Sequence, residues 1–295
     1  MTLRVREAGL LTTVQDRGRR GFAHLGVPRG GALDAPAAAL GNRLVGNDED
    51  AAVLEVTLGG LEVTSDAGVW VAVTGAPGPV TGDGRPRAED RAEWLAAGVV
   101  LRLGAPDRGV RGYVAVAGGI DVPAVFGSRS TDTLAWVGPP RVEAGAILPV
   151  GRPTGPPRAS DTPRPPVGDG LRLLPGPHAA WFAPDALDRL VAGEYTVAGD
   201  SDRIGLRTQG PTVPRADGAA AELPSQGMVL GAVQVPPDGQ PIVFLADHPT
   251  TGGYPVVAVV DPVDLWQCAQ ARPGEPVRFR RPSDRARPAR GAATR

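Results

Sequence analysis

The chain has 295 residues, of which 42% are hydrophobic, and this length favours two domains that each bury their own core. Its 31 basic residues are balanced by 32 acidic ones, which excludes a large basic surface for nonspecific nucleic-acid binding. All the basic side chains are arginines. Without lysine, the chain can hold no Walker A phosphate loop, no Schiff base and no attached biotin.

The cysteine content and the apolar segments indicate where the protein works. Cys268 is the single cysteine, so an intrachain disulfide is excluded and a reducing compartment is favoured. The N-terminus is charged within its first ten residues, and no segment approaches the roughly 20 apolar residues of a membrane span. We therefore expect a cytoplasmic protein with no membrane partner.

Short apolar runs bounded by glycine and proline recur along the chain and predict turn-rich β structure. Runs of this spacing are typical of a β-sandwich or a β-barrel, so the fold class is predicted to be mainly β. They occupy residues 53–66, 69–76, 99–106, 111–119, 170–176 and 194–200.

Three short helices are predicted. Asp34 can cap a first helix that Gly46 ends, and Pro184 with Asp185 opens a second that ends at Gly193. A third begins at Asp261 and is broken at residues 273–274. Cys268 falls within it, which favours packing over use as a nucleophile.

The composition divides the chain into four parts. Residues 1–150 and 171–281 are predicted to form the two domains. Residues 151–170 are rich in proline and predict a semi-rigid linker. Residues 282–295 are polar and basic with little to bury, which predicts a disordered tail, with a nucleic-acid arm as the alternative.

The first candidate site is the glycine-rich loop after residue 12, TTVQDRGRRGFAHLGVPRGGALD, where Gln15 and Asp16 precede several arginines. Arginine offers a planar donor group suited to carboxylate or phosphate. The alternative is a solvated loop in which Asp16 pairs with a nearby arginine. The arginines are Arg17, Arg19, Arg20 and Arg29.

A second candidate is the sequence Gly127-Ser128-Arg129-Ser130-Thr131-Asp132, in which hydroxyl groups flank an arginine. It can form an anion cradle. It can equally be a turn in which Ser130 or Asp132 bonds to its own backbone.

Residues 225–255 are the most chemically diverse part of the chain. Two strands, one containing Gln234, are predicted on either side of a turn at residues 237–239. Asp247 and His248 follow, and histidine has the near-neutral pKa that a general base needs. Neighbours in a strand point to opposite faces, so Asp247 can orient His248 only if the strand ends before them. With three histidines in the chain, a multi-histidine metal site is not expected, and we predict no metal ligands.

Several motifs together resemble one known family. They are TVQDRGRRGFAHLGVPRGGALD, GNRLVGND, YVAVAGGIDVP, GSRSTD, SDRIGLR, GAVQVPPDGQPIVFLADHPTTGGYP and the Pro-Gly pair at 273–274. In this order, over residues 3–280, they resemble the KipA-like biotin-dependent carboxyltransferase family. That family includes one component of bacterial 5-oxoprolinase and the carboxyltransferase part of urea carboxylase.

The resemblance implies two β-barrel domains of the cyclophilin-like type and a shared activity. That activity is the ATP-dependent opening of 5-oxo-L-proline to L-glutamate, carried out with two partner chains, one KipI-like and one LamB-like. ATP would enter with Mg²⁺ in the complex, and no biotin would be attached to this chain. The resemblance leaves two alternatives, carboxyl transfer to urea or a related amide, and regulation of a KipI-like kinase inhibitor.

The site implied by these motifs combines a catalytic set and a binding set. The catalytic set is Asp16, Asp247 and His248. The set for substrate or phosphate is Gln15, Arg17, Arg20, Ser128, Arg129, Ser130, Gln234, Thr250, Thr251, Gly252, Gly253 and Tyr254. Family members commonly have glutamine where this chain has Pro249, which removes an amide and a backbone donor.

Overall fold

The computed structural model describes residues 1–159, 168–216, 218 and 223–282. The centre of the predicted linker and nearly all of the predicted tail lie outside these ranges. The chain divides into two compact units. Unit 1 comprises Met1–Asp161 together with Ala246–Thr250, and unit 2 comprises Thr162–Leu245 and Thr251–Arg295. As predicted, the fold is mainly β with three short α-helices.

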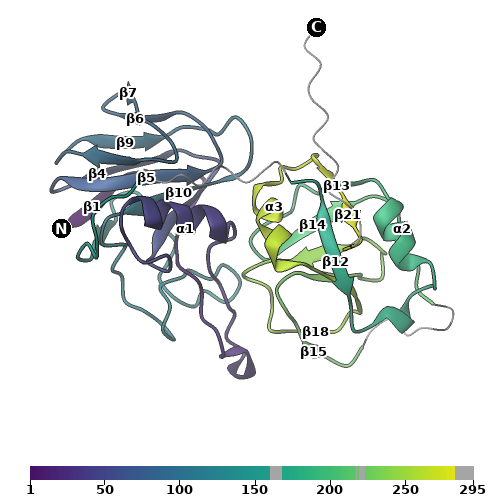
Figure 1. Cartoon of the computed structure of the whole chain (residues 1–295). Coiled ribbons are helices and arrows are strands. Elements are labelled where there is room, and N and C mark those ends of the chain that lie inside the picture. Colours follow the sequence, from purple (N-terminus) through teal and green to yellow (C-terminus); the bar gives the residue numbers. More distant parts are fainter. Residues whose placement is uncertain (160–167, 217, 219–222, 283–295) are drawn as a thin grey trace, which may run out of the picture. The chain divides into compact units, whose positions relative to one another are not determined.

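Unit 1 is built from two sheets and one helix (Figure 1). The first sheet has the strand order β11-β1-β4-β9-β6-β7, and the second has the order β2-β3-β10-β5-β8. Strands of the first sheet are β1 (Thr2–Ala8), β4 (Leu61–Ser65), β6 (Val80–Gly82), β7 (Arg85–Pro86), β9 (Val100–Leu103) and β11 (Ile147–Pro149). Strands of the second are β2 (Leu11–Gln15), β3 (Val53–Thr57), β5 (Val69–Gly75), β8 (Ala92–Leu95) and β10 (Arg111–Val116).

Helix α1 (Ala35–Leu44) packs on β5 and β10, as Figure 1 shows. It begins as predicted, because the Asp34 side chain accepts a hydrogen bond from the Ala37 backbone N–H at 3.0 Å. The core of this unit consists mainly of valine, leucine and alanine. Burying these side chains stabilises the unit at roughly 25 cal/mol per Å² of apolar surface removed from water.

A polar network is buried next to the start of this helix. The Glu55 carboxylate accepts hydrogen bonds from the Tyr113 hydroxyl and the Leu33 backbone N–H, both at 2.9 Å. The Tyr113 hydroxyl in turn accepts from the Asp34 N–H at 2.8 Å. Burial raises the pKa of Tyr113 well above its ordinary value, so the phenol stays protonated and donates to Glu55. This network holds the end of the first glycine-rich loop against β3.

Unit 1 extends beyond the predicted domain end at residue 150. The Gly151 N–H donates to the Gly119 carbonyl at 3.0 Å, and the Arg158 N–H donates to the Leu44 carbonyl at 2.8 Å. The described part of the predicted linker before residue 160 is therefore packed on this unit.

Unit 2 contains an eight-stranded, nearly closed barrel sheet with the order β20-β13-β14-β17-β16-β19-β12-β21 (Figure 1). A separate pair joins β15 (Gln226–Gly227) to β18 (Thr251–Gly252), and the α-helices are α2 (Ala186–Ala192) and α3 (Leu265–Gln270). Strands of the large sheet are β12 (Leu171–Pro175), β13 (Tyr195–Val197), β14 (Gly205–Gln209), β16 (Ala232–Gln234), β17 (Ile242–Phe244), β19 (Val256–Val260), β20 (Pro276–Val277) and β21 (Phe279–Arg280). Short 3-10 turns occupy η1 (Ala23–Leu25), η2 (Ala179–Trp181) and η3 (Pro262–Asp264).

Several local predictions for unit 2 are confirmed. Strands β16 and β17 pair antiparallel around a turn in which Gly239 has a φ of 78°, a conformation that glycine adopts without steric cost. Cys268 is buried in α3.

In neither unit does the described part of the chain contain a helix that is both long and apolar enough to span a bilayer.

Candidate functional site

Three segments far apart in sequence meet within unit 1. They are the loop after β2 (residues 15–31), the loop at 128–138 and the segment Ala246–Thr250. The Gly30 N–H donates to the Ala246 carbonyl at 3.1 Å, which joins the first loop to the third segment. The Thr133 side chain donates to Asp247 at 2.8 Å, which joins the second loop to it. The predicted site regions 15–20 and 128–132 therefore lie together. The predicted acid and base, Asp247 and His248, lie with them.

The Asp16 carboxylate connects the first two loops through hydrogen bonds. Its Oδ1 accepts hydrogen bonds from the Gly18 N–H at 2.7 Å and from the Ser128 and Ser130 hydroxyls at 2.6 Å each. Its Oδ2 accepts from the Arg129 N–H at 2.6 Å. A carboxylate that already accepts four short bonds has little accepting capacity left for a ligand. This geometry favours a positioning role for Asp16 over the predicted catalytic one.

Gln15 also joins the two loops. Its side-chain amide donates to the Thr131 carbonyl at 2.9 Å and to the Thr13 hydroxyl at 3.0 Å, and the residue is fully buried. Its amide nitrogen therefore supports the loop and does not face solvent, where a ligand would arrive.

Two arginines that were predicted to hold anions have protein partners in the structure. Arg17 pairs with Glu49 at 3.0 Å on the surface. Arg129 pairs with Asp121 at 2.6 Å and donates to the Val122 carbonyl at 2.8 Å. Surface ion pairs of this kind contribute little stability, but they direct both guanidinium groups toward neighbouring carboxylates.

Arg19 is the buried arginine of this cluster. It was named with the arginines of the first candidate loop but was not included in the site implied by the family motifs. It is 2% exposed and donates to the carbonyls of Ser130, Val137 and Val125. Burial lowers the pKa of Arg19, whereas nearby carboxylates, Asp132 among them, act in the opposite direction. The side chain ties the first loop to the backbone of the second. Its position in a loop with three other arginines gave no signal that it alone would be buried.

Asp247 lies in a buried acidic environment. It is fully buried, and its Oδ2 accepts from both the N–H and the hydroxyl of Thr133 at 2.8 Å. Asp132 is also fully buried, and burial raises its pKa, with the Asp247 carboxylate raising it further. Sequence reasoning singled out neither Asp132 nor Thr133 as a separate site residue, because the partner of Thr133 is 114 residues away.

His248 is buried beside this pair, with an exposure of 6%. Its Nδ1 lies 2.7 Å from the Pro249 carbonyl oxygen. A carbonyl can only accept, so Nδ1 carries the proton and Nε2 is the basic nitrogen of the neutral ring. Strand β17 ends at Phe244, before Asp247, yet it is Pro249 that orients the imidazole. The tautomer is thus set by the backbone carbonyl of residue 249, a group that does not depend on the residue being proline.

The surroundings of His248 keep it neutral. Burial lowers its pKa and the positive charge of Arg29 lowers it further, while the Pro249 hydrogen bond and the Asp247 charge partly oppose this. The imidazole is therefore available as a base around neutral pH.

We expect His248 to titrate with a midpoint below the ordinary histidine value of about 6.5. Its basic form should be fully present above that midpoint and should be lost as the pH falls through it, since a lowered pKa disfavours the protonated ring. An NMR titration of the imidazole protons measures this directly. A midpoint for His248 at or above the ordinary value would contradict the assignment.

The remaining predicted binding residues belong mostly to unit 2. The Gln234 side-chain amide donates to the Tyr254 carbonyl at 3.1 Å, and the Gly253 carbonyl accepts from Leu223 N–H at 2.7 Å. A Cβ at Gly252 would lie 3.0 Å from the Gln234 amide nitrogen, so close packing explains that glycine. Thr251 is exposed in β18, while Thr250 ends the segment of unit 1. Their roles toward a substrate remain predictions.

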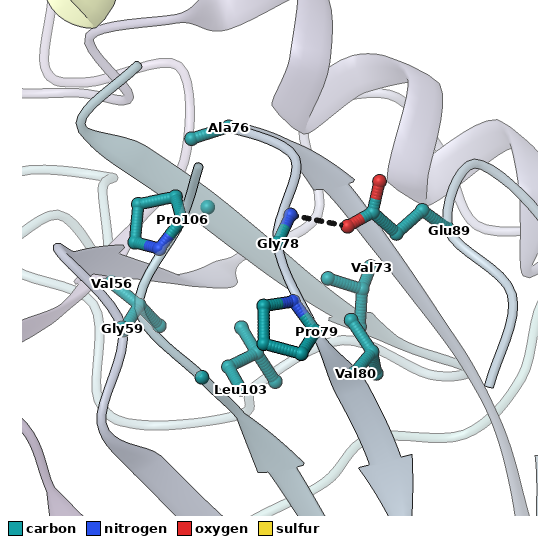
Figure 2. Close-up of a pocket in the computed structure, with 12 residues that line it drawn as sticks. Val56, Gly59, Val73, Ala76, Gly78, Pro79, Val80, Glu89, Leu103 and Pro106 are labelled. Atoms are coloured by element: carbon teal, nitrogen blue, oxygen red, sulfur yellow. Dashed lines mark hydrogen bonds between the residues drawn. The ribbon is translucent and has the colours of Figure 1, made fainter. Parts of the chain in front are cut away.

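A small cavity in unit 1 lies away from this cluster, between the two sheets (Figure 2). Its volume of about 20 Å³ is enough for a single water molecule. Val73, Val80, Leu103, Pro79 and Pro106 line it, and the Gly78 N–H donates to Glu89 at 2.6 Å at its edge. It cannot hold a substrate ring. In the part of the chain that the structure describes, no cluster of three or more His, Cys, Asp or Glu side chains is placed to hold a metal ion.

Sequence comparison relates nearly the whole chain to one domain family. The model of the carboxyltransferase domain, subdomains A and B, matches residues 25–281. The C subunit of the 5-oxoprolinase of Escherichia coli (strain K12) is 39% identical over 94% of this chain and 90% of that relative. The Saccharomyces cerevisiae urea amidolyase is 31% identical over 92% of this chain, which corresponds to 16% of its own length.

Solved structures agree with this relationship. The crystal structure of TTHA0988 matches 95% of this chain with a TM-score of 0.85 and 41% identity. The chain spans 55% of that protein, about half of its length. The K. lactis urea amidolyase matches 94% of this chain with a TM-score of 0.86 and 27% identity, and this chain spans 18% of it.

Proposed function

The chain belongs to the family of the carboxyltransferase domain, subdomains A and B, and on this basis we propose that it is the C subunit of an ATP-dependent 5-oxoprolinase. The observation that carries the proposal is the 39% identity to a relative of that name over 94% of this chain and 90% of the relative. The reaction would open the lactam ring of 5-oxo-L-proline to L-glutamate.

The chemistry fits the cluster in unit 1. A lactam carbonyl is a poor electrophile, and phosphorylation of its oxygen by ATP activates the carbon toward water. The neutral Nε2 of His248 would accept the proton of that water as it adds. The C–N bond would then break with protonation of the ring nitrogen, and a second water would release phosphate from the acyl phosphate that results. Cationic side chains would hold the substrate carboxylate and the phosphoryl oxygens. Thr250, which belongs to the same unit, would orient the substrate.

The proposal needs partner chains. Acting with one KipI-like and one LamB-like partner, this chain would be inactive alone. ATP would enter as its magnesium complex, and the proposal gives this chain no metal ligand. Because the reaction consumes ATP, the proposal places it in the cytoplasm.

The test is reconstitution with each component left out in turn. This chain is purified with candidate KipI-like and LamB-like partners, and the formation of glutamate and ADP from 5-oxoproline and ATP is followed. Turnover only in the complete mixture is expected. A stable complex with the KipI-like partner that produces no glutamate under any condition would argue against the oxoprolinase assignment.

Carboxyl transfer from carboxybiotin to urea or a related amide is the second candidate. It is supported by the family name and by the TM-score of 0.86 with the K. lactis urea amidolyase. Since this chain has no lysine, the biotin would be carried by another protein. Incorporation of labelled bicarbonate into urea, in the presence of a biotin carboxylase and a biotin carrier, would distinguish it from ring opening.

A further inference from the structure

Arg29 belongs to a loop that is hydrogen-bonded to the segment carrying the proposed base, and its positive charge acts on His248. The Arg29 carbonyl accepts from the Arg19 N–H at 2.8 Å, and the next residue, Gly30, donates its N–H to the Ala246 carbonyl at 3.1 Å. Backbone hydrogen bonds thus connect this part of the loop to the buried Arg19 and to the segment that carries His248. These bonds involve only the backbone, so the Arg29 guanidinium group is not needed to hold the loop in place and can bind another group.

The positive charges of Arg29 and Arg20 are not balanced by a carboxylate of the described residues. Arg29 is half-buried and Arg20 is exposed, and neither guanidinium forms an ion pair or a side-chain hydrogen bond with any residue in the described ranges. Burial lowers the pKa of Arg29 and the like charge of Arg20 lowers it further. A partly desolvated cation next to a second cation is unfavourable unless an anion joins them.

The neighbouring carboxylates already have donors. Asp16 accepts from two serines and two backbone N–H groups, and Asp247 accepts twice from Thr133. Asp132 accepts from the Ala135 N–H at 2.5 Å. Arg29 and Asp247 are among the charges that act on His248, and they shift its pKa in opposite directions. The charge missing at Arg29 and Arg20 is therefore one that a ligand can bring.

We propose that Arg29 and Arg20 form the anion-binding pair of this site and hold a carboxylate or phosphoryl group beside His248. Two guanidinium groups offer the planar, multiple donors that both kinds of oxyanion accept. The inference deepens the proposed function, on which its ligand chemistry rests, because the substrate and its phosphorylated form carry these two groups. It replaces Arg17 and Arg129, whose guanidinium groups face Glu49 and Asp121.

Binding of an anion to Arg29 and Arg20 would also change the pKa of His248. The positive charge of Arg29 lowers the pKa of His248, so an anion that neutralises Arg29 raises it. A ligand would thereby make Nε2 more basic at the moment it is needed. The same coupling makes His248 a reporter of anion binding that requires no turnover.

The experiment is an NMR titration of the imidazole protons in the full chain, which has only three histidines. The probes are inorganic phosphate, 5-oxo-L-proline and 2-pyrrolidinone, which is the same lactam without the carboxylate, at constant ionic strength set with sodium chloride. Phosphate or 5-oxoproline should raise the pKa of His248, and 2-pyrrolidinone should not. A response to phosphate alone identifies a phosphoryl site, and a response to 5-oxoproline alone identifies a carboxylate site.

Three variants complete the test. Arg29→Gln should raise the pKa of His248 in the free protein and weaken anion binding by about tenfold or more, as expected for the loss of a charged hydrogen bond. Arg29→Lys should keep the free pKa low while weakening binding. Arg17→Gln is the matched control from the same loop and should change neither.

Absence of any response to both anions, or an unchanged response in Arg29→Gln, would overturn the proposal. So would an equal loss in Arg17→Gln, since that would indicate only the general charge of the loop. Because binding is measured without the partner chains, an inactive reconstituted complex with an intact anion response would contradict the proposed function and leave this inference standing.

Discussion

Replacing His248 by alanine is expected to lower turnover of the reconstituted complex by about 100-fold to 10,000-fold, the range that a general base contributes. The reason is the position of its Nε2, which is neutral and basic because Nδ1–H is bonded to the Pro249 carbonyl and burial disfavours the charged ring. The measurement is glutamate formation by the complete mixture, with complex formation checked by size-exclusion chromatography.

The matched control is His24→Ala, which changes an exposed histidine of the same unit and should leave turnover unchanged. His248→Asn keeps a polar side chain of similar reach but has no basic nitrogen, so it should be as inactive as the alanine variant. Full activity of either His248 variant in an intact complex would remove this residue from the mechanism.

Asp16→Ala is expected to lower the free energy of unfolding of the chain by about 3 kcal/mol or more, because donors buried around the carboxylate lose their shared acceptor. The two serine hydroxyls and the N–H groups of Gly18 and Arg129 would all need new partners. Urea unfolding of the purified chain measures the change. Asp50→Ala, which changes an exposed carboxylate of the same unit, should stay within about 0.5 kcal/mol of the unchanged chain.

The same variant separates two roles for Asp16. A positioning residue, as the geometry favours, loses stability and turnover together. If Asp16→Ala instead unfolds at the same urea concentration as the unchanged chain and is inactive, the catalytic role inferred from sequence is correct. Ser130→Ala, which removes one of the hydroxyl donors, should be milder, at about 1 kcal/mol.

The local elements were predictable because their signals lie within a few residues of one another. Asp34 caps the helix that follows it, and the turn around Gly239 joins two largely apolar strands. Lysine-free composition likewise decided which chemistries the chain can support. Sequence also located the three loops that carry the candidate site, through their glycine, hydroxyl and arginine content.

The roles of residues within those loops were not predictable in the same way. Arg17, Arg19, Arg20 and Arg29 look alike in sequence, yet Arg17 is paired on the surface and Arg19 is buried. The charge of Arg20 acts on Arg29, and that of Arg29 acts on His248. Which arginine is buried depends on carbonyl groups more than 100 residues away, such as those of Ser130 and Val137. Local propensity contains no information about such partners.

The sequence by itself determined a mainly β chain with short helices, the first of them capped by Asp34, no lysine chemistry, and an acid and histidine motif at residues 247–248. Only the tertiary structure decided that Ala246–Thr250 belongs to unit 1, that three of the four donors to Asp16 come from 112 to 114 residues away, and that the charge of Arg29 acts on His248. The physical reason is that hydrogen-bonding capacity is a property of each residue, whereas its satisfaction depends on which distant groups the fold brings within about 3 Å.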